Sequence, residues 1–226
     1  MNLPKLDQRL MCAAEAVKKC SLVADVGTDH AYLPVYLVLS GRCDYAIASD
    51  INEGPVRRAI LNVTGYGLNN KIQVIKTDGL HGIEEYEPDT VLVLGMGGEL
   101  IAKILAEAPW LRTNKTGLIL QPMTHPEAVR EYLWNNGFEI TEEKLCRCGK
   151  IYNVTVAAYT GQNTTYTPID ALVGKADMLR DSDLWKPYLE HLADIYSVRI
   201  KGILSGGGDA SFETEVLSAL RTLASV

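Results

Sequence analysis

The sequence predicts an α/β protein in which a mostly parallel, doubly wound sheet ends in an antiparallel hairpin and is followed by a small helical hairpin. Short apolar runs alternate with stretches of helical periodicity up to about residue 160, which is the pattern of βαβ units. Two apolar runs around "CRCGKI" are too close together to hold a helix between them. A polar segment at 160–168 then separates a helical tail from the rest.

Each expected element follows from this pattern in order. Helical spacing predicts a lead-in helix near residues 6–19. Apolar runs predict strands at 21–25, 44–49, 72–76, 90–94, 117–121, 137–145 and 151–159. Helix-sized spacers separate the first five strands, whereas Gly149 supplies a turn between the last two. A parallel sheet that finishes in a hairpin is typical of class I (Rossmann-like) S-adenosylmethionine-dependent methyltransferases more than of dehydrogenases.

The segment "TGQNTTYTP" marks the expected domain boundary. We therefore expect a Rossmann-like methyltransferase domain over residues 1–160 and a helical hairpin over 161–226. Helical spacing runs from Leu184 to Ile203, "GGGD" interrupts it, and residues 211–224 resume it. Three aromatic side chains in this tail can stack on nucleic-acid bases, but their core-like spacing favours helix packing: Trp185, Tyr188 and Tyr196.

Composition and charge restrict the class of protein. A chain of 226 residues with 47% hydrophobic and 22% charged residues is not disordered, and no uncharged apolar run approaches the roughly 18 residues of a membrane span. A net charge of −6 argues against a generally basic nucleic-acid binder, although it leaves room for a local basic patch. The N-terminal "MNLPKLDQRL" predicts a cytoplasmic protein, and the five scattered cysteines predict free thiols. We expect no membrane partner, no metal, and a monomer or weak dimer.

The first candidate ligand loop is "ADVGTDHAYLP" at 24–34, which follows the first predicted strand at the edge where doubly wound sheets bind ligands. A dinucleotide loop has the pattern GxGxxG, but here Gly27 is followed by Asp29 and His30. A carboxylate at that place repels a pyrophosphate. Asp25 and Asp29 instead suit a cationic cofactor such as S-adenosylmethionine. The alternative is that one of the two carboxylates caps the following helix.

Carboxylates recur after the next two predicted strands. Asp50 lies 23 residues after Gly27, the spacing at which an acidic side chain receives ribose hydroxyls. Asp78 follows the third strand, where its carboxylate can accept a hydrogen bond from an adenine amino group while Gly79 lets the ring approach. A single Asp at a strand end is a common turn former. A succession of them at one edge indicates a cofactor site.

Two further loops face the same edge. Gly95, Met96, Gly97 and Gly98 follow the fourth strand, which lies beside the first in a doubly wound sheet. The glycines leave room for a flat base and the methionine can pack on a ring, although a tight turn explains this motif equally well on its own. The fifth strand leads to Gln121, whose amide can read an adenine edge.

Together, "VADVGTDHAYLP", "SDINEGP", "TDGL", "VLGMGG" and "LILQP" resemble the bacterial tRNA (adenine(22)-N(1))-methyltransferases, the TrmK family. The resemblance includes the lead-in "LDQRL", covers about 1–160, and continues more weakly in "LVGKADML" and the helical tail. It implies methyl transfer from S-adenosylmethionine to an adenine ring nitrogen in the D-arm region of tRNA. The family often has glycine where this chain has Thr77, a departure that leaves Asp78 and Gly79 in place.

The resemblance also implies a cofactor site made of Gly27, Asp29, His30, Asp50, Ile51, Asp78, Gly79 and residues 95–98. Adenine N1 already carries a lone pair, so the reaction needs alignment more than activation. Asp29 and Gln121 are the catalytic candidates. Methylation leaves the ring cationic, and Asp29 either stabilises that charge or holds the cofactor.

Two other functions are compatible with part of this sequence pattern. A methyltransferase of small molecules or proteins would have the same cofactor motifs, and the acidic balance favours it slightly. A non-catalytic RNA-binding module would leave the acidic loops unexplained.

Overall fold

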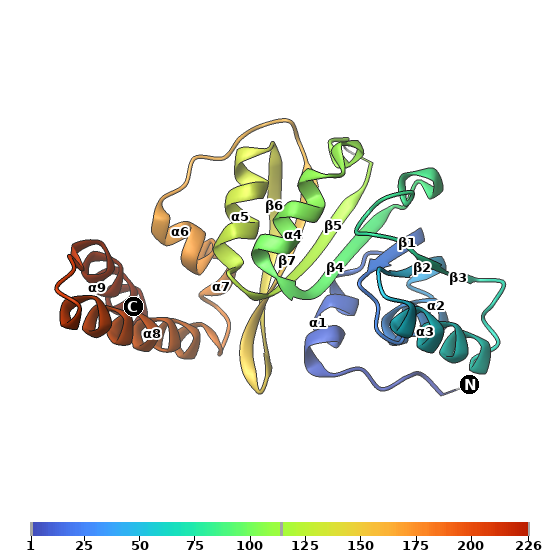
Figure 1. The fold of residues 1–226 in the computed structure, drawn as a ribbon, viewed down its shortest axis with the longest axis horizontal. Coiled ribbons are helices and arrows are strands. Elements are labelled where there is room, and N and C mark those ends of the chain that lie inside the picture. The colour runs from blue at the N-terminus through green and yellow to red at the C-terminus, as the bar shows by residue number, and fades with distance from the viewer. Residues whose placement is uncertain (1, 114, 226) are drawn as a thin grey trace. The chain divides into compact units, whose positions relative to one another are not determined.

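The computed structural model describes residues 2–113 and 115–225, and its sheet has the strand order β3-β2-β1-β4-β5-β7-β6 (Figure 1). The strands are β1 (Cys20–Val26), β2 (Cys43–Asp50), β3 (Ile72–Lys76), β4 (Thr90–Gly97), β5 (Gly117–Thr124), β6 (Phe138–Cys148) and β7 (Lys150–Tyr159). The first five strands are parallel, and β7 runs antiparallel to both β5 and β6. The predicted parallel sheet with a terminal hairpin is confirmed, with Gly149 in the turn at a φ of +70°.

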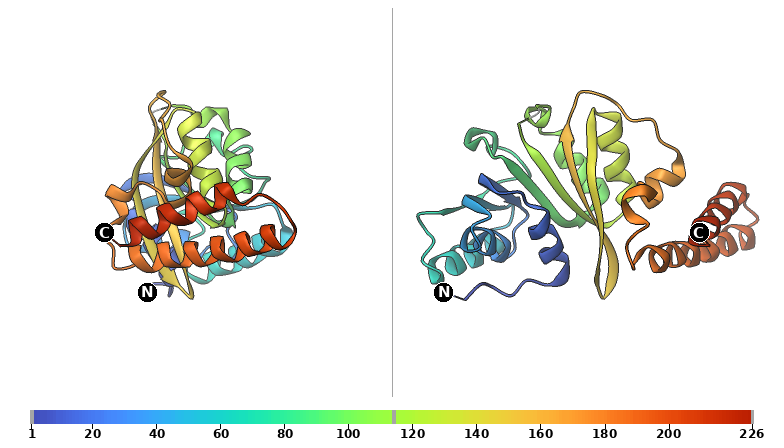
Figure 2. Two further views of the ribbon diagram at one scale, coloured as in Figure 1. Left: turned by 90° about the vertical axis from the view of Figure 1, so that its left-hand side faces the viewer. Right: turned by 180° about the vertical axis from the view of Figure 1, so that it is seen from behind.

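Helices cover both faces of this sheet (Figures 1 and 2). Those of the first unit are α1 (Gln8–Ala16), α2 (Tyr32–Leu39), α3 (Glu53–Gly65), α4 (Gly98–Ala106) and α5 (Pro126–Asn135), with short 3-10 turns at Glu84–Tyr86 and Pro109–Leu111. Helix α2 contacts α1 and α3, whereas α4 packs against α5. Because the central strands are covered on both sides, consecutive residues such as Leu92 and Val93 are fully buried.

The lead-in helix α1 is shorter than its expected range. Asp7 caps it, because its carboxylate accepts a hydrogen bond of 2.7 Å from the Leu10 amide. The backbone returns to an extended conformation at Val17. Helix α1 contacts β5, β6 and β7 and reaches the edge of the sheet where the parallel strands end.

The order of the strands determines which loops meet. Strand β1 pairs with β2 on one side and with β4 on the other, with Val26 beside both Ser49 and Val93. The loops that follow these three strands therefore open at the same edge. Irregular pairing of β4 with β5 between Leu94 and Gly97 turns the end of β4 into the start of α4.

The chain divides into two compact units, Met1–Thr165 and Tyr166–Val226. Residues 160–165 belong with the first unit, because the Thr160 and Gly161 amides donate to the Gly137 carbonyl and the Thr164 amide donates to the Trp134 carbonyl. The composition therefore changes at residue 160, whereas the packing of the first unit continues to residue 165.

The second unit contains α6 (Pro168–Val173), α7 (Ala176–Leu179), α8 (Trp185–Ser205) and α9 (Ser211–Ala224). Helices α8 and α9 form the expected pair, whereas α6 and α7 were not expected. Helix α6 begins with a capping box between Thr167 and Asp170. Trp185 and Tyr188 are buried, and the Tyr188 hydroxyl donates to the Leu172 carbonyl at 3.1 Å, so these rings serve packing. Among the described residues, no helix is long and apolar enough to cross a membrane.

Candidate functional site

Two adjoining cavities open at the carboxyl edge of the parallel strands, each with a volume of about 380 Å³. The first cavity is lined by Arg9, Leu10, Asp25, Gly27, Thr28, Asp29, His30, Ala31, Tyr32, Leu33, Leu94 and Gly95. The second cavity is lined by Val26, Gly27, Asp50, Ile51, Asn52, Thr77, Asp78, Gly79, Met96, Leu100 and Ile104. Loops from four strands thus line one two-part site, and Gly27 belongs to both parts.

Most of the residues expected from the sequence lie in these walls, and three do not. Gly97, Gly98 and Gln121 line neither cavity. Gly98 is buried, and a Cβ atom there would lie 2.0 Å from the His125 carbonyl oxygen. This glycine therefore permits the close approach of α4 to the loop after β5 and leaves no space for a ligand base, which corrects the expectation for it.

Gly27 and Met96 stand where the two cavities meet. Gly27 has a φ of +81°, which favours glycine, and a Cβ atom there would lie 2.0 Å from Cε of Met96. The end of the Met96 side chain thus rests on the bare backbone of the first loop. A flexible thioether at this point can shift to admit an elongated ligand that runs from one cavity into the other.

Asp25 is the buried acid of the first cavity. It lies at the end of β1 and its residue surface is only 6% exposed. Burial, and to a smaller extent the nearby Asp50 carboxylate, raise the pKa of Asp25 to about 6, although a hydrogen bond from Thr28 opposes the shift. An ionised carboxylate in this position is short of solvation and is stabilised by a positively charged ligand.

Asp29 has a different environment, although it is only four residues away. Its side chain is 65% exposed and is paired with the Arg58 guanidinium from α3. His30 Nε2 lies 3.2 Å from the other oxygen of the same carboxylate. The structure therefore separates the two acids of the loop into one that is buried and one that is exposed and already paired.

Neither acid caps the helix that follows the loop. The N-cap residue of α2 is Ala31, which has a φ of +54° and no side-chain capping bond. Thr28 Oγ1 instead accepts a hydrogen bond from the Ala31 amide at 3.1 Å. The capping alternative is therefore wrong, since neither carboxylate serves as the N-cap of α2.

The second cavity combines two carboxylates with apolar walls. One oxygen of Asp50 accepts a hydrogen bond of 2.7 Å from the Asn52 amide. The carboxylate still has acceptor capacity for a diol. Asp78 lines the same cavity, together with Ile51 and Leu100, whose side chains are about half exposed. A sugar with adjacent hydroxyls and a flat heterocycle match this combination of acceptors and apolar surface.

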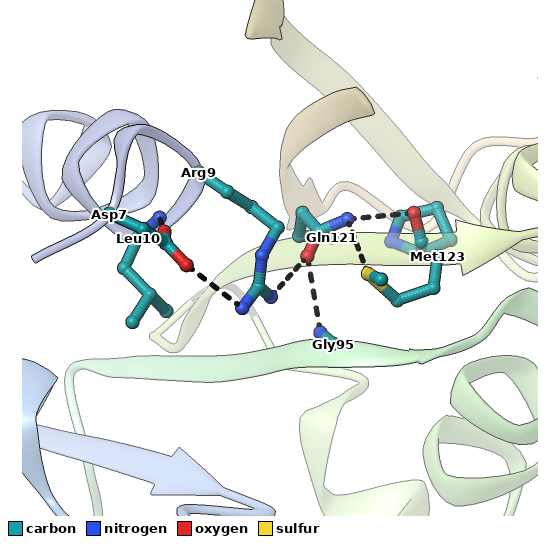
Figure 3. A network of polar contacts seen from close by, with 7 residues as sticks. Asp7, Arg9, Leu10, Gly95, Gln121 and Met123 are labelled. Carbon is teal, nitrogen blue, oxygen red and sulfur yellow. Dashed lines mark hydrogen bonds and ion pairs between the residues drawn. The ribbon is translucent and has the colours of Figure 1, made fainter. Parts of the chain in front are cut away.

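Gln121 holds a polar network together rather than facing a ligand (Figure 3). Its Oε1 accepts hydrogen bonds from Arg9 Nη1 at 2.8 Å and from the Gly95 amide at 3.2 Å, and its Nε2 donates to the Pro122 carbonyl at 2.8 Å. The residue is fully buried. Its amide is thus engaged and enclosed, which corrects the expectation that it reads an adenine edge. It positions Arg9 and the turn after β4.

Arg9 also lines the first cavity, although the sequence analysis did not single it out. Its guanidinium comes from α1, lines the first cavity and lies 3.5 Å from the Asp7 carboxylate. The side chain is only 19% exposed. Its partner Gln121 is 112 residues away in the chain, so no local sequence pattern predicts this contact. The only signal was its place in "LDQRL", at the start of the resemblance.

Within residues 2–113 and 115–225, no group of three or more His, Cys, Asp or Glu side chains could hold a metal ion. The charged groups of the two cavities are therefore four carboxylates and one guanidinium, with His30 beside them. Such a set suits an organic ligand with a positive centre and one anionic group.

Comparisons with known proteins show which proteins this chain resembles. A family model described as a methyltransferase domain matches residues 6–155. A Bacillus subtilis (strain 168) protein named tRNA (adenine(22)-N(1))-methyltransferase is 39% identical over 175 residues, which are 77% of this chain and 74% of that protein. The crystal structure of the B. subtilis m1A22 tRNA methyltransferase TrmK has a TM-score of 0.82 at 32% identity and covers 98% of this chain and 97% of its own. A Streptococcus pneumoniae structure in complex with S-adenosyl-L-methionine has a TM-score of 0.85 at 30% identity, with 96% and 98% covered.

Proposed function

Because the chain belongs to the methyltransferase-domain family and, within it, to the tRNA (adenine(22)-N(1))-methyltransferases, we infer that it transfers a methyl group from S-adenosylmethionine to N1 of adenine 22 in tRNA. The relative solved with S-adenosyl-L-methionine supports the choice of cofactor. Two cavities at the carboxyl edge of the parallel strands, where this class of fold binds its ligands, support the proposal.

The observation that carries this proposal is the match between the charges of the site and those of the cofactor. S-adenosylmethionine has an ammonium, a sulfonium, a carboxylate, a ribose diol and an adenine. The first cavity offers the buried Asp25 to the positive groups and Arg9 to the carboxylate. The second cavity offers Asp50 to the diol, with Asp78 and apolar side chains for the adenine. Each polar or charged group of the cofactor thus has a side chain of matching chemistry in one of the two cavities.

The residues of the chain act mainly by binding and alignment. When bound, S-adenosylmethionine supplies a methyl group attached to a positively charged sulfur. Adenine N1 attacks with its own lone pair, so no side chain has to remove a proton before the attack. Because N1 lies on the Watson–Crick edge, adenine 22 has to be unpaired or flipped out to reach the site. We propose two alternative roles for Asp29: it either holds the cofactor or stabilises the positive charge of the methylated ring.

Asp50→Ala is expected to weaken cofactor binding by about 1–3 kcal/mol, because it removes the acceptor for the ribose hydroxyls. Isothermal titration calorimetry with S-adenosylmethionine measures the loss. Asp44→Ala is the matched control, since Asp44 is an exposed acid on the same strand that lines neither cavity. An affinity equal to that of the wild type in Asp50→Ala would remove Asp50 from the site.

The proposed reaction is tested by mapping the product. Purified protein is incubated with S-adenosylmethionine and unmodified tRNA, and nuclease fragments are analysed by mass spectrometry. One added methyl group at adenine 22, and none in a tRNA carrying guanine there, is the expected result. Label that enters protein or small molecules but no tRNA supports a different methyltransferase. A complete lack of cofactor affinity supports a non-catalytic RNA-binding module.

We also propose that the two compact units are separable domains with different tasks. A chain that ends at residue 165 retains every residue of both cavities, as well as the hydrogen bonds that tie residues 160–165 to the first unit. It is expected to bind S-adenosylmethionine like the full chain and to methylate tRNA at least about tenfold more slowly, equivalent to ~1.4 kcal/mol of lost substrate binding. Calorimetry and methylation assays on the same preparation measure both. Full tRNA activity would assign the helical unit another role.

Two properties remain predictions: a cytoplasmic location and a monomeric or weakly dimeric state. Cell fractionation and sedimentation velocity measure them.

A further inference from the structure

The first cavity carries an aromatic pair that the cofactor contacts proposed above do not use. Tyr32 is the first residue of α2, lines the cavity and is 43% exposed. The His30 ring is stacked against it, with ring centroids 5.2 Å apart and planes inclined by 22°. A large exposed aromatic ring at the wall of a ligand cavity is available for stacking on a second ring system.

The loop that presents this pair is held in an uncommon conformation. Ala31, between the two rings, has a φ of +54°, a left-handed geometry that costs free energy for a residue with a side chain. Two hydrogen bonds hold this backbone in place. Thr28 Oγ1 accepts a hydrogen bond from the Ala31 amide, and Asn62 Nδ2 donates one of 2.7 Å to the His30 carbonyl. The rings are therefore presented by a fixed piece of backbone.

The orientation of His30 is determined by charge as well as by stacking. Its Nε2 lies 3.2 Å from the Asp29 carboxylate, which in turn pairs with Arg58 on α3. The aromatic pair consequently has a carboxylate at one edge. An aromatic face and a nearby carboxylate both attract a flat ring that bears positive charge.

We propose that Tyr32 and His30 form the platform on which the target adenine stacks while it is methylated. This inference rests on the function proposed above and adds the subsite for the base. Adenine N1 bonds to the methyl carbon with its lone pair, the carbon–sulfur bond breaks with its electron pair left on sulfur, and the positive charge passes from sulfur to the adenine ring. The platform binds that ring more tightly as its charge grows, so it stabilises the transition state more than the substrate. Gln121, being enclosed, cannot serve this purpose.

The platform is tested with Tyr32→Leu, Tyr32→Ala and Tyr32→Phe in the full chain. Stacking of a base on an aromatic side chain contributes about 1–3 kcal/mol, so kcat/KM for tRNA is expected to fall roughly 5- to 150-fold in the Leu and Ala variants. The Phe variant keeps the ring face and is expected to retain most of the activity. Affinity for S-adenosylmethionine stays unchanged in all three. Tyr45→Ala, which removes an equally exposed tyrosine that lines neither cavity, is the control.

Several outcomes overturn the platform. Normal tRNA methylation in Tyr32→Leu shows that no aromatic face is needed, and a Phe variant as impaired as the Leu variant shows that the hydroxyl group is what matters. Loss of cofactor affinity in either variant assigns Tyr32 to the cofactor instead. These results differ from a failure of the proposed function itself, in which the wild-type protein binds S-adenosylmethionine but methylates no tRNA.

Discussion

Asp25→Asn is expected to make the protein more stable while it removes most of the affinity for S-adenosylmethionine. The pKa of Asp25 is about 6 in the folded chain, compared with an ordinary value of 3.8. The folded chain therefore holds the proton more tightly than the unfolded chain, so the free energy of unfolding falls as pH rises from about 4 to about 6. This difference corresponds to up to ~3 kcal/mol at neutral pH. Thermal and urea unfolding between pH 4 and 8 measure it, and the variant should lack this pH-dependent loss.

Cofactor affinity should show the opposite dependence on pH. The ionised Asp25 attracts the positive groups of the cofactor, and below pH ~6 binding has to displace a proton. The dissociation constant of the wild-type protein is therefore expected to rise up to about tenfold for each pH unit below 6, whereas that of Asp25→Asn should be high and flat across the same range. Asp44→Asn, an exposed acid at the opposite end of β2, should behave like the wild type. A wild-type affinity that does not change between pH 5 and 7 contradicts the assignment.

Arg9→Gln is expected to weaken S-adenosylmethionine binding by about 2–4 kcal/mol, or roughly 30- to 1000-fold. Removing one member of a largely buried charge pair leaves the other member, the cofactor carboxylate, without its partner. Arg9→Lys keeps the charge but not the planar pair of donors, so an intermediate loss is expected. Calorimetry measures all three proteins. Arg112→Gln is the matched control, because Arg112 is a hydrogen-bonded arginine that lines neither cavity.

Adenosine provides a second control for the same variant. It lacks the methionine portion and therefore the carboxylate, so its affinity should be the same in Arg9→Gln as in the wild type. If adenosine binding falls as much as S-adenosylmethionine binding, then Arg9 acts by supporting the turn at Gly95 through Gln121 and not by contacting the ligand.

The order of the elements of the first unit, and the edge of the sheet at which their loops meet, followed from sequence, because both depend on local patterns. The apolar runs that became β1 to β7 have the length and flanking turns of strands, and the helix-sized spacers between the first five are typical of parallel pairing. The carboxyl ends of parallel strands meet at one edge, so Asp25, Asp50 and Asp78 could be placed together without coordinates. The family resemblance added the substrate, which no local pattern specifies.

Only the tertiary structure decided which of these side chains are buried, paired or exposed in the two cavities. Asp25 and Asp29 are the same residue type in one segment, so the sequence does not distinguish them. In the structure Asp25 is buried, whereas Asp29 is exposed and pairs with Arg58 from α3. Gln121 lies near the carboxyl end of its strand, as Asp25 and Asp50 do, yet its amide oxygen accepts hydrogen bonds from Arg9 and the Gly95 amide.

The physical reason is that burial and partnership depend on residues far away in the chain. Arg9 joins the cavity because α1 returns to the end of β5, a contact across 112 positions. The end of the first unit near residue 165 similarly depends on hydrogen bonds to Trp134 and Gly137. The composition of the sequence does not predict these hydrogen bonds. The sequence by itself determined the elements and the edge at which they meet. Long-range packing decided which polar groups at that edge stay solvated, pair with each other or remain available to a ligand.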